Sequence, residues 1–355
     1  MLTSIRLQNF RSYLDDSFEL SESVNIIVGK NASGKTNLLE SILINAGENS
    51  YRGKDIELIN HNSDWAKIDC NNEDNTVRTV KLQTVNSNIV RTYEIDGNQY
   101  KRLNLVKTIP VVVFEPNNLN ILTTSPDSRR NFLDELLEKI KPGFKEKRRQ
   151  YKRVLYQRNA LLKTGIRNAQ NNLFVWNLRL SELGDYIFNN RTELIDTINQ
   201  FAEEIYNELS ITKSTVSFEY VTKLNKNNYA SDLIKSLERN INTDIERGFT
   251  SSGPHRDDFD LILNNHMASE TASRGEMRTL MLVCKILETR VIEKSRSIKP
   301  ILLLDDVFSE LDGGRRQALT NFLKEYQTFI TTTDADVVLH HFSDQANIIA
   351  ISKTN

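Results

Sequence analysis

The amino-acid sequence predicts an α/β protein in which a lobe of mixed β-sheets, built from both ends of the chain, carries an inserted lobe of short antiparallel helices. Three observations support this fold class. Strand-like patterns occur in the first third of the chain and return near its C-terminal end. Between them, apolar residues recur at helical spacings. A glycine-containing loop stands between an apolar strand and an amphipathic helix near the N-terminus.

The composition is that of a folded protein. The 355 residues are 39% hydrophobic and 26% charged, and their formal net charge is −1, which argues against disorder. No apolar run reaches the roughly 18 to 20 residues that cross a bilayer. Arg6 and Arg11 lie where a signal peptide would need an unbroken hydrophobic run. Cys70 and Cys284 are isolated, which disfavours a disulfide or zinc framework. We therefore expect a cytoplasmic protein with no membrane partner.

The N-terminal segments predict strands and one helix. Residues 4–13 alternate with a period near two, which suits a strand on a sheet edge. Residues 24–29 form an apolar strand, and after Lys35 leucine and isoleucine recur at helical steps. The sequence Asp96-Gly97-Asn98 between two β-branched runs predicts a hairpin, and residues 109–116 add another apolar strand.

The middle of the chain predicts helices. Ser125 is a good N-cap, Pro126 fits the first helical turn, and an apolar face follows. A basic helix is expected over residues 144–163, and a longer helical region follows up to about residue 205. Its apolar stripes are typical of a helical-bundle core rather than of a cofactor site.

Strand patterns return after about residue 245, in the segments DFDLIL, PILLLDDV, TFITTT and NIIAI, with a helix between Glu276 and Lys294. Strands from both ends of a chain can pair in one parallel sheet around an insertion. We therefore assign residues 1–125 and 246–355 to a discontinuous lobe and residues 126–245 to the inserted helical lobe.

Residues 29–36 read GKNASGKT and match the phosphate-binding pattern G-x-x-x-x-G-K-[ST] in the strand–loop–helix context that it requires. In such a loop the backbone N–H groups converge on phosphates at the positive end of the helix. Lys35 would neutralise phosphate oxygens, and the hydroxyl of Thr36 would bind Mg²⁺. The expected nucleotide contacts are Gly29, Lys30, Asn31, Ala32, Ser33, Gly34, Lys35 and Thr36.

Residues 301–306 read ILLLDD, an apolar strand that ends in two carboxylates. Alone, this pair could cap a helix or be solvated at a strand end. Together with the glycine loop it predicts that Asp305 holds Mg²⁺ through water and that Asp306 orients or deprotonates an attacking water. The candidate catalytic residues are therefore Lys35, Asp305 and Asp306, and the candidate Mg²⁺ ligands are Thr36 and Asp305.

Residues 271–278, TASRGEMR, form a polar turn before an amphipathic helix. Ser273 and the N–H of Gly275 could donate hydrogen bonds to an anion at this helix N-terminus. Ser-x-Gly before a helix is also an ordinary cap. The octapeptide alone leaves both interpretations open.

Together these motifs resemble the ATP-binding-cassette (ABC) ATPases of chromosome maintenance and repair, the group of Rad50, the SMC proteins and RecF. Segments similar to RecF family signatures follow one another in the family order: NFRSY, GKNASGKTNLLE, SPDSRRNFLDE, YKRVLYQRNALLK, GPHRDD, SRGEMRTL and LLLDDVFSELD. The short helical lobe fits RecF, whereas Rad50 and SMC proteins carry long coiled coils. The resemblance implies an ABC-type P-loop ATPase that binds ATP and Mg²⁺.

The resemblance further implies an ATP-dependent homodimer. In this dimer the P-loop of one copy, residues 29–36, faces the signature turn of the other copy, residues 271–278. On this mapping, the contacts beyond the P-loop are Asn9 and Arg11 near the nucleotide, Ser273, Gly275 and Glu276 across the dimer, and Asp312 at the same interface. The sequence departs from the wider group at two places. Asp306 stands where related ATPases often have Glu, and residues 332–334 (Thr-Thr-Asp) stand where they have a His. Slow hydrolysis that acts as a timer is the expected result.

A basic segment, residues 145–153, predicts DNA contacts. The candidates are Lys145, Arg148, Arg149, Lys152 and Arg153, most of which follow steps of three and four. Such a stripe would bind phosphates without sequence preference, although a solvated helix face would show the same pattern. The resemblance implies binding of double-stranded DNA near gaps or junctions, and cooperation with RecO and RecR in loading RecA. His255 in GPHRDD is expected to be structural.

The resulting hypothesis is a DNA replication and repair ATPase with weak, DNA-stimulated hydrolysis that drives release from DNA. A rival hypothesis is the nucleotide-binding subunit of a transporter, which the long basic insertion and the lack of a second glycine after Gly275 disfavour. A non-hydrolysing structural DNA clamp and a subunit of a Rad50-like nuclease complex also stay open, although no nuclease site is identifiable in the sequence.

Overall fold

The computed structural model describes residues 1–86, 88–115, 125–164, 173–210, 212–333, 338, 342 and 346–352. The chain divides into two compact units, the first comprising Met1–Asn118 and Glu288–Asn355 and the second Leu119–Leu287. The C-terminal boundary falls inside one helix, α10 (Arg274–Arg296). None of the helices in the described residues combines the length and the apolar character needed to cross a membrane.

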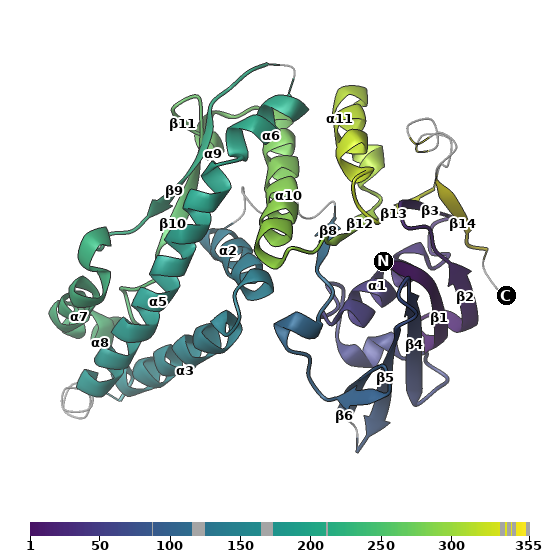
Figure 1. Ribbon diagram of the computed structural model, residues 1–355. Coiled ribbons are helices and arrows are strands. Elements are labelled where there is room, and N and C mark those ends of the chain that lie inside the picture. Colours follow the sequence, from purple (N-terminus) through teal and green to yellow (C-terminus); the bar gives the residue numbers. More distant parts are fainter. Residues whose placement is uncertain are drawn as a thin grey trace. The chain divides into compact units, whose positions relative to one another are not determined.

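A five-stranded parallel sheet in the first unit is built from both ends of the chain, as the sequence predicts (Figure 1). The strand order is β14-β3-β13-β12-β8, and each neighbouring pair is parallel. Its strands are β3 (Val24–Val28), β8 (Val111–Phe114), β12 (Ile301–Asp305), β13 (Thr328–Thr332) and β14 (Asn347–Ala350). The near-continuous burial of β3, β12 and β13 explains why their sequences are unbroken apolar or threonine-rich runs.

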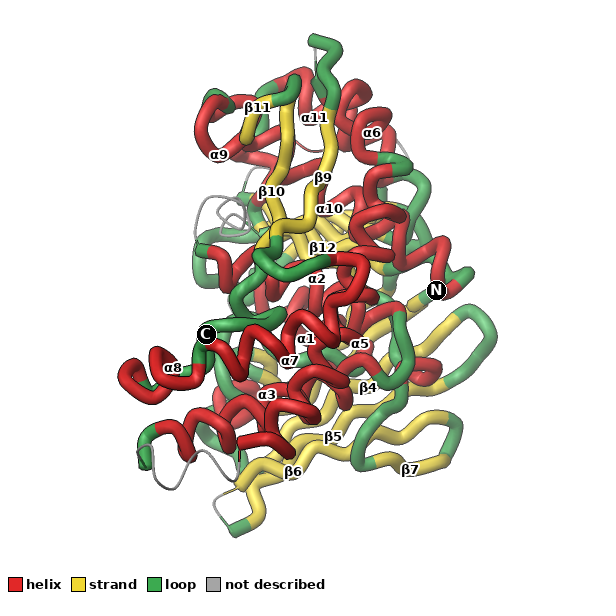
Figure 2. Tube along the Cα trace, turned by 90° about the vertical axis from the view of Figure 1, so that its left-hand side faces the viewer, coloured by secondary structure: helices red, strands yellow, loops and turns green. Residues whose placement is uncertain are grey.

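The first unit also contains a six-stranded antiparallel sheet of order β2-β1-β4-β5-β6-β7. Figure 2 shows its strands β4, β5, β6 and β7. Its strands are β1 (Leu2–Phe10), β2 (Tyr13–Glu19), β4 (Trp65–Asn72), β5 (Val77–Val85), β6 (Asn88–Ile95) and β7 (Asn98–Tyr100). The predicted hairpin is confirmed, and Asp96 and Gly97 both have the positive φ that its two-residue turn requires. The predicted edge position of β1 is wrong, because β1 pairs with β2 on one side and β4 on the other. Its alternating pattern reflects one buried face rather than a free edge.

Helix α1 (Lys35–Ala46) contacts strands of both sheets in the first unit. Most of its side chains are buried, and Leu38, Leu39 and Ile42 belong to one apolar core with residues of β1, β4 and β12. Because this helix begins at the glycine loop, the core on both sides fixes where the loop presents its N–H groups. Helix α11 (Gly313–Leu323) belongs to the same unit.

The second unit is mainly helical, as predicted. Its helices are α2 (Pro126–Ile140), α3 (Phe144–Leu162), α5 (Leu173–Asn199), α6 (Ala202–Leu209), α7 (Tyr229–Arg239), α8 (Ile241–Arg247) and α9 (Ala268–Thr271), followed by the start of α10. Ser125 caps α2 by accepting a hydrogen bond from the N–H of Ser128. Helices α3 and α5 pack side by side (Figure 1).

A three-stranded antiparallel sheet, β11-β10-β9, lies within the second unit (Figure 2). Its strands are β9 (Val216–Val221), β10 (Asp258–Leu263) and β11 (His266–Met267). Strand β9, whose side chains alternate between buried and less buried positions, was not predicted from the sequence. The sequence-based boundary also grouped residues 246–287 with the other lobe, whereas the structure places them in the second unit, where β10 pairs with β9.

Candidate nucleotide-binding site

The glycine loop joins β3 to α1 in a conformation that requires glycine. Gly34 has φ of 112°, a value that side-chain-bearing residues rarely adopt, and it is the N-cap of α1. A Cβ atom at Gly29 would lie 2.5 Å from Oγ of Ser33 and 2.7 Å from the carbonyl oxygen of Ile351. The loop therefore presents the N-terminus of a twelve-residue helix, where the helix dipole favours an anion.

The side chain of Lys35 folds back over this loop. Its Nζ donates to the carbonyl oxygens of Gly29 at 2.9 Å and Lys30 at 3.2 Å, and the residue is buried. Both acceptors are neutral, which leaves the ammonium charge available for phosphate oxygens. The same loop is held by Tyr13, whose hydroxyl donates to the carbonyl oxygen of Gly34 at 3.0 Å.

Asp305, at the end of β12, accepts hydrogen bonds from three hydroxyl groups. Thr36 and Thr331 donate to its Oδ1 at 3.0 and 2.9 Å, and Tyr51 donates to its Oδ2 at 3.2 Å. Burial, followed by the charge of Asp305, raises the pKa of the Tyr51 hydroxyl, so this group remains a donor at neutral pH. The hydroxyl of Thr36 and the carboxylate of Asp305 are adjacent oxygen donors of the kind that Mg²⁺ prefers.

Asp306 follows directly and adopts a left-handed backbone conformation with φ of 52°. Its N–H donates to Oγ1 of Thr331 at 2.9 Å, which fixes the turn after β12. Burial raises the pKa of the Asp306 carboxyl, the charge of Lys35 opposes this, and the charge of Asp305 adds to it. A carboxyl with a raised pKa is better suited to accept a proton from water than an ordinary aspartate.

Arg11 is held by carboxylates. Its Nε and Nη2 atoms donate to Glu40 on α1 at 2.8 and 2.9 Å, and Nη1 lies 3.7 Å from Glu57. Asn9, at the end of β1, has a positive φ, and its carbonyl oxygen accepts from the N–H of Asn60. These contacts tie the β1–β2 turn to the helix that follows the P-loop, and a nucleotide contact from either residue stays a prediction.

The segment after α1 contributes residues that sequence patterns did not indicate. Besides Tyr51, it contains Ser50, whose hydroxyl donates to Glu40, and Arg52, whose Nη1 donates to the Asn37 side-chain oxygen at 3.0 Å. Three consecutive residues thus contact either the P-loop helix or Asp305. Their position directly after the P-loop helix was the one sequence feature that could have pointed to these residues, because no spacing pattern marks them.

The predicted signature turn lies in the second unit, at the start of α10. Oγ of Ser273 accepts from the N–H of Glu276 at 3.3 Å, and Oε2 of Glu276 accepts from the N–H of Ser273 at 2.8 Å. This reciprocal pair is a capping box, and its hydrogen bonds lower the pKa of Glu276. The capping interpretation is therefore observed, while contacts of Ser273, Gly275 and Glu276 with nucleotide stay predictions.

Asp312, also predicted at the dimer interface, caps α11. Its Oδ1 accepts from the N–H of Arg315 at 3.0 Å, and its carboxylate pairs with the Arg315 side chain. The backbone hydrogen bond from Arg315 is the main cause that lowers the pKa of Asp312. Of the residues that replace the expected histidine, Thr332 ends β13, Thr333 follows, and Asp334 lies outside the described residues.

The predicted DNA-binding residues lie on α3, and one of them differs from the rest. Lys145, Arg149, Lys152 and Arg153 are exposed. The guanidinium of Arg148 instead lies 2.8 Å from both Asp134 and Glu138, with its side chain only 12% exposed. Arg148 therefore joins α3 to α2, and the remaining four residues form the exposed basic stripe.

Comparison with known proteins identifies the family. The model described as RecF/RecN/SMC N terminal domain matches residues 1–354. The chain is 35% identical over 361 residues to the DNA replication and repair protein RecF of Clostridium beijerinckii, covering 98% of this chain and 96% of the relative. The chain belongs to the RecF family. It is also 32% identical to RecF of Clostridium perfringens, covering 99% of this chain and 98% of the relative.

Solved structures agree with this family membership. A structure of the recombination mediator protein RecF with ATPrS, in the RecFOR pathway, matches with a TM-score of 0.86 and 27% identity, covering 100% of this chain and 98% of the other. The Smc head domain of Pyrococcus furiosus matches with a TM-score of 0.54 and 16% identity over 99% of this chain and 93% of the other, which shows a shared fold. The predicted RecF family and ABC-type fold class are thus confirmed.

Proposed function

We propose that this RecF family protein is an ATP-dependent DNA-binding clamp of recombinational repair. It binds ATP, pairs with a second copy, holds double-stranded DNA near gaps or junctions, and releases it after slow hydrolysis. The observation that carries this proposal is the 3.0 Å contact between Thr36 of the P-loop and Asp305 at the end of β12, in a chain similar over almost its whole length to RecF proteins. A role in DNA repair would place the protein in the cytoplasm.

ATP would bind with its phosphates at the N-terminus of α1, where the loop N–H groups and Lys35 face an anion. Mg²⁺ would be held by the Thr36 hydroxyl and the Asp305 carboxylate, and it would neutralise phosphate charge there. The donor set supports this assignment because both groups are oxygen donors that already lie side by side.

Hydrolysis would depend on Lys35 and Asp306. Lys35 stabilises negative charge on the phosphate oxygens, and Asp306 orients the attacking water and accepts its proton. The position of Asp306 supports this role, because Asp306 directly follows Asp305, whose carboxylate lies 3.0 Å from the hydroxyl of Thr36 in the P-loop. An aspartate reaches the water less well than a glutamate would, so the ATPase is expected to be weak and to be stimulated when DNA improves the alignment of the site.

A second copy would complete the site. The turn at residues 273–276, of which Ser273 and Arg274 are exposed, presents the N-terminus of a 23-residue helix, which favours an anion such as the γ-phosphate. Asp312 would lie at the same interface. ATP would therefore act as the link between the copies, and its hydrolysis would separate them.

DNA would bind the basic stripe of α3 through phosphate contacts that are independent of sequence. A related RecF structure is described as part of the RecFOR pathway, which supports cooperation of this chain with RecO and RecR in loading RecA.

The proposal is tested by titrating labelled duplex DNA, gapped or continuous, with the protein and ATP, ADP or no nucleotide. We expect ATP to increase affinity for the wild type but not for Lys35→Met, and we expect the gapped duplex to bind more tightly. The exposed residue Lys101 supplies a matched control, Lys101→Met, which should respond to ATP as the wild type does. Affinity that is unchanged by ATP would contradict the proposal.

A further inference from the structure

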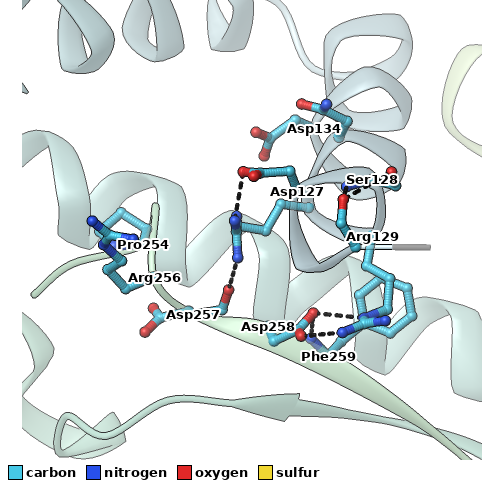
Figure 3. A network of polar contacts seen from close by, with 12 residues as sticks. Asp127, Ser128, Arg129, Asp134, Pro254, Arg256, Asp257, Asp258 and Phe259 are labelled. Carbon is cyan, nitrogen blue, oxygen red and sulfur yellow. Dashed lines mark hydrogen bonds and ion pairs between the residues drawn. The ribbon is translucent and has the colours of Figure 1, made fainter. Parts of the chain in front are cut away.

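Two motifs that the proposed function leaves without a role bind each other in the second unit. They are SPDSRR, residues 125–130 at the start of α2, and GPHRDD, residues 253–258 just before β10. Arg129 donates through Nε and Nη2 to the two carboxylate oxygens of Asp258, at 2.9 and 2.5 Å (Figure 3). Arg130 donates through Nη1 to the carbonyl oxygen of Asp257 at 2.7 Å. Consecutive arginines thus hold consecutive residues of the other motif.

The Arg129–Asp258 contact is a bidentate ion pair that is largely shielded from water. The side chains of Arg129 and Asp258 are 18% and 20% exposed, so solvent screens their attraction less than it screens a surface pair. The fork geometry also fixes the direction of approach of the two groups. The first turn of α2 and the first residue of β10 therefore keep one relative position.

The GPHRDD turn is held from its other side as well. The buried carboxylate of Asp257 accepts from the hydroxyls of Tyr220 at 3.0 Å, Tyr229 at 2.6 Å and Thr222 at 2.7 Å. Arg191 donates to the carbonyl oxygen of Pro254 at 2.7 Å. With contacts on both sides, the turn has little freedom to shift, and it gives the Arg129–Asp258 pair a rigid base.

One member of the ion pair, Arg129, lies near the start of α10. Arg129 lines a cavity of about 40 Å³ together with Phe259 and Leu261 of β10, Ala268 and Ser269 of α9, and Met277 in the first turn of α10. Ser273 lies between α9 and α10, and α9 packs on β10. A displacement of β10 relative to α2 would therefore be transmitted to the turn that carries Ser273 and Glu276.

We propose that Arg129 and Asp258 are positioning residues for the signature turn: their ion pair fixes β10 and α9, and these fix residues 273–276 for contact with the nucleotide of the second copy. This inference rests on the proposed function, because it assigns a task to a turn that acts across the dimer. It also predicts a local property of the free protein, namely the rigidity of residues 268–277.

The test compares Arg129→Gln, Asp258→Asn and Arg129→Lys with the wild type. Arg129→Lys keeps the positive charge but cannot make the bidentate contact. Its effect on dimerisation and amide exchange should therefore be intermediate, and the unit should stay folded. The matched control is Arg179→Gln, which removes an exposed pair with Glu182 in the same unit. Three quantities are measured: binding of fluorescent ATP, ATP-dependent dimerisation by sedimentation, and backbone amide hydrogen exchange over residues 268–277 without nucleotide.

For Arg129→Gln we expect ATP affinity within about twofold of the wild type, since the P-loop lies in the other unit, and a dimer at least about tenfold weaker. Amide exchange over residues 268–277 should be faster. Unchanged exchange and unchanged dimerisation in Arg129→Gln and Arg129→Lys would overturn the inference. If the wild type itself fails to dimerise with ATP, the proposed function fails, and amide exchange alone then decides whether the ion pair holds the turn.

Discussion

The hydroxyl of Thr36 donates a hydrogen bond of 3.0 Å to Oδ1 of Asp305, a residue that lies 269 positions further along the chain. The contact exists because β13 pairs with both β3 and β12, so that the carboxyl ends of these parallel strands meet at one edge of the sheet. The loop after β3 then lies beside the carboxylate at the end of β12. Strands from both ends of the chain must therefore pair before the two halves of the proposed Mg²⁺ site can meet.

Removal of the Thr36 hydroxyl should weaken binding of ATP only when Mg²⁺ is present. We expect Thr36→Val to lose about tenfold or more in affinity for Mg·ATP, because one oxygen ligand is gone, whereas Thr36→Ser should bind almost normally. Titration with fluorescent ATP, once in Mg²⁺ and once in EDTA, separates the loss of the metal ligand from a loss of support for the loop. An equal loss under both conditions would mean that Thr36 supports the loop rather than the metal.

Replacement of Asp306 should block hydrolysis and preserve nucleotide binding. We expect Asp306→Asn to hydrolyse ATP about 10² to 10⁴ times more slowly and to remain dimeric for longer. An Asp306→Asn variant with wild-type turnover would contradict this role.

The ion pair between Arg11 and Glu40 should matter for stability. Glu40 is fully buried, so Arg11→Ala would leave a carboxylate without its main partner, at a cost of about 3 kcal/mol in the free energy of unfolding. The matched control is Arg6→Ala, which removes a half-exposed pair with Asp15 and should destabilise the protein much less. Urea unfolding of both variants gives the comparison, and equal losses would refute the distinction.

His255 should make stability depend on pH. Its ring lies 2.6 Å from the hydroxyl of Tyr151 and 3.1 Å from the carbonyl oxygen of Thr250, and burial lowers its pKa to about 4. The unfolded chain then binds an extra proton between the two pKa values. The stability contributed by neutral His255 is thus complete above about pH 6.5 and decreases toward pH 4, by roughly 3 kcal/mol in total.

The variant His255→Gln, which can keep both contacts, should remove much of this pH dependence. Unfolding measured at pH 7 and pH 5 should show a smaller difference for the variant than for the wild type. The same pH dependence in both proteins would show that other groups are responsible. A structural role for His255, as expected from the sequence, accords with its two hydrogen-bonding contacts.

The exposed stripe on α3 should bind DNA phosphates. We expect Lys152→Glu combined with Arg153→Glu to lower affinity for duplex DNA and to reduce the steepness of its salt dependence, because fewer counterions are released. Lys235→Glu, at an exposed position on α7 in the same unit, serves as the control. Unchanged salt dependence in the double variant would show that DNA binds at another surface.

Sequence patterns predicted the features that are local. The P-loop, the strand that ends in Asp305 and the helix after Ser273 each have a signal within a few residues, and the structure contains all three elements. Features that depend on distant partners were not predictable. The position of β1 inside its sheet depends on β4, and the contact of Tyr51 with Asp305 depends on the pairing of both chain ends.

The inserted region shows the same limit. Its apolar stripes predict helices, and β9 was missed because a six-residue strand is short against that background. Arg148 belongs to the basic segment of the sequence. Its pairing with Asp134 and Glu138 depends on how α2 packs against α3, which the sequence pattern does not reveal.

Sedimentation of the purified protein in saturating Mg·ATP, compared with its Ser273→Arg variant, tests the shared nucleotide site most directly. We predict that the wild type forms a dimer with ATP and is monomeric without it, while Ser273→Arg binds ATP normally but stays monomeric. A wild-type protein that binds ATP and remains a monomer, or a Ser273→Arg variant that dimerises as well as the wild type, would contradict this prediction.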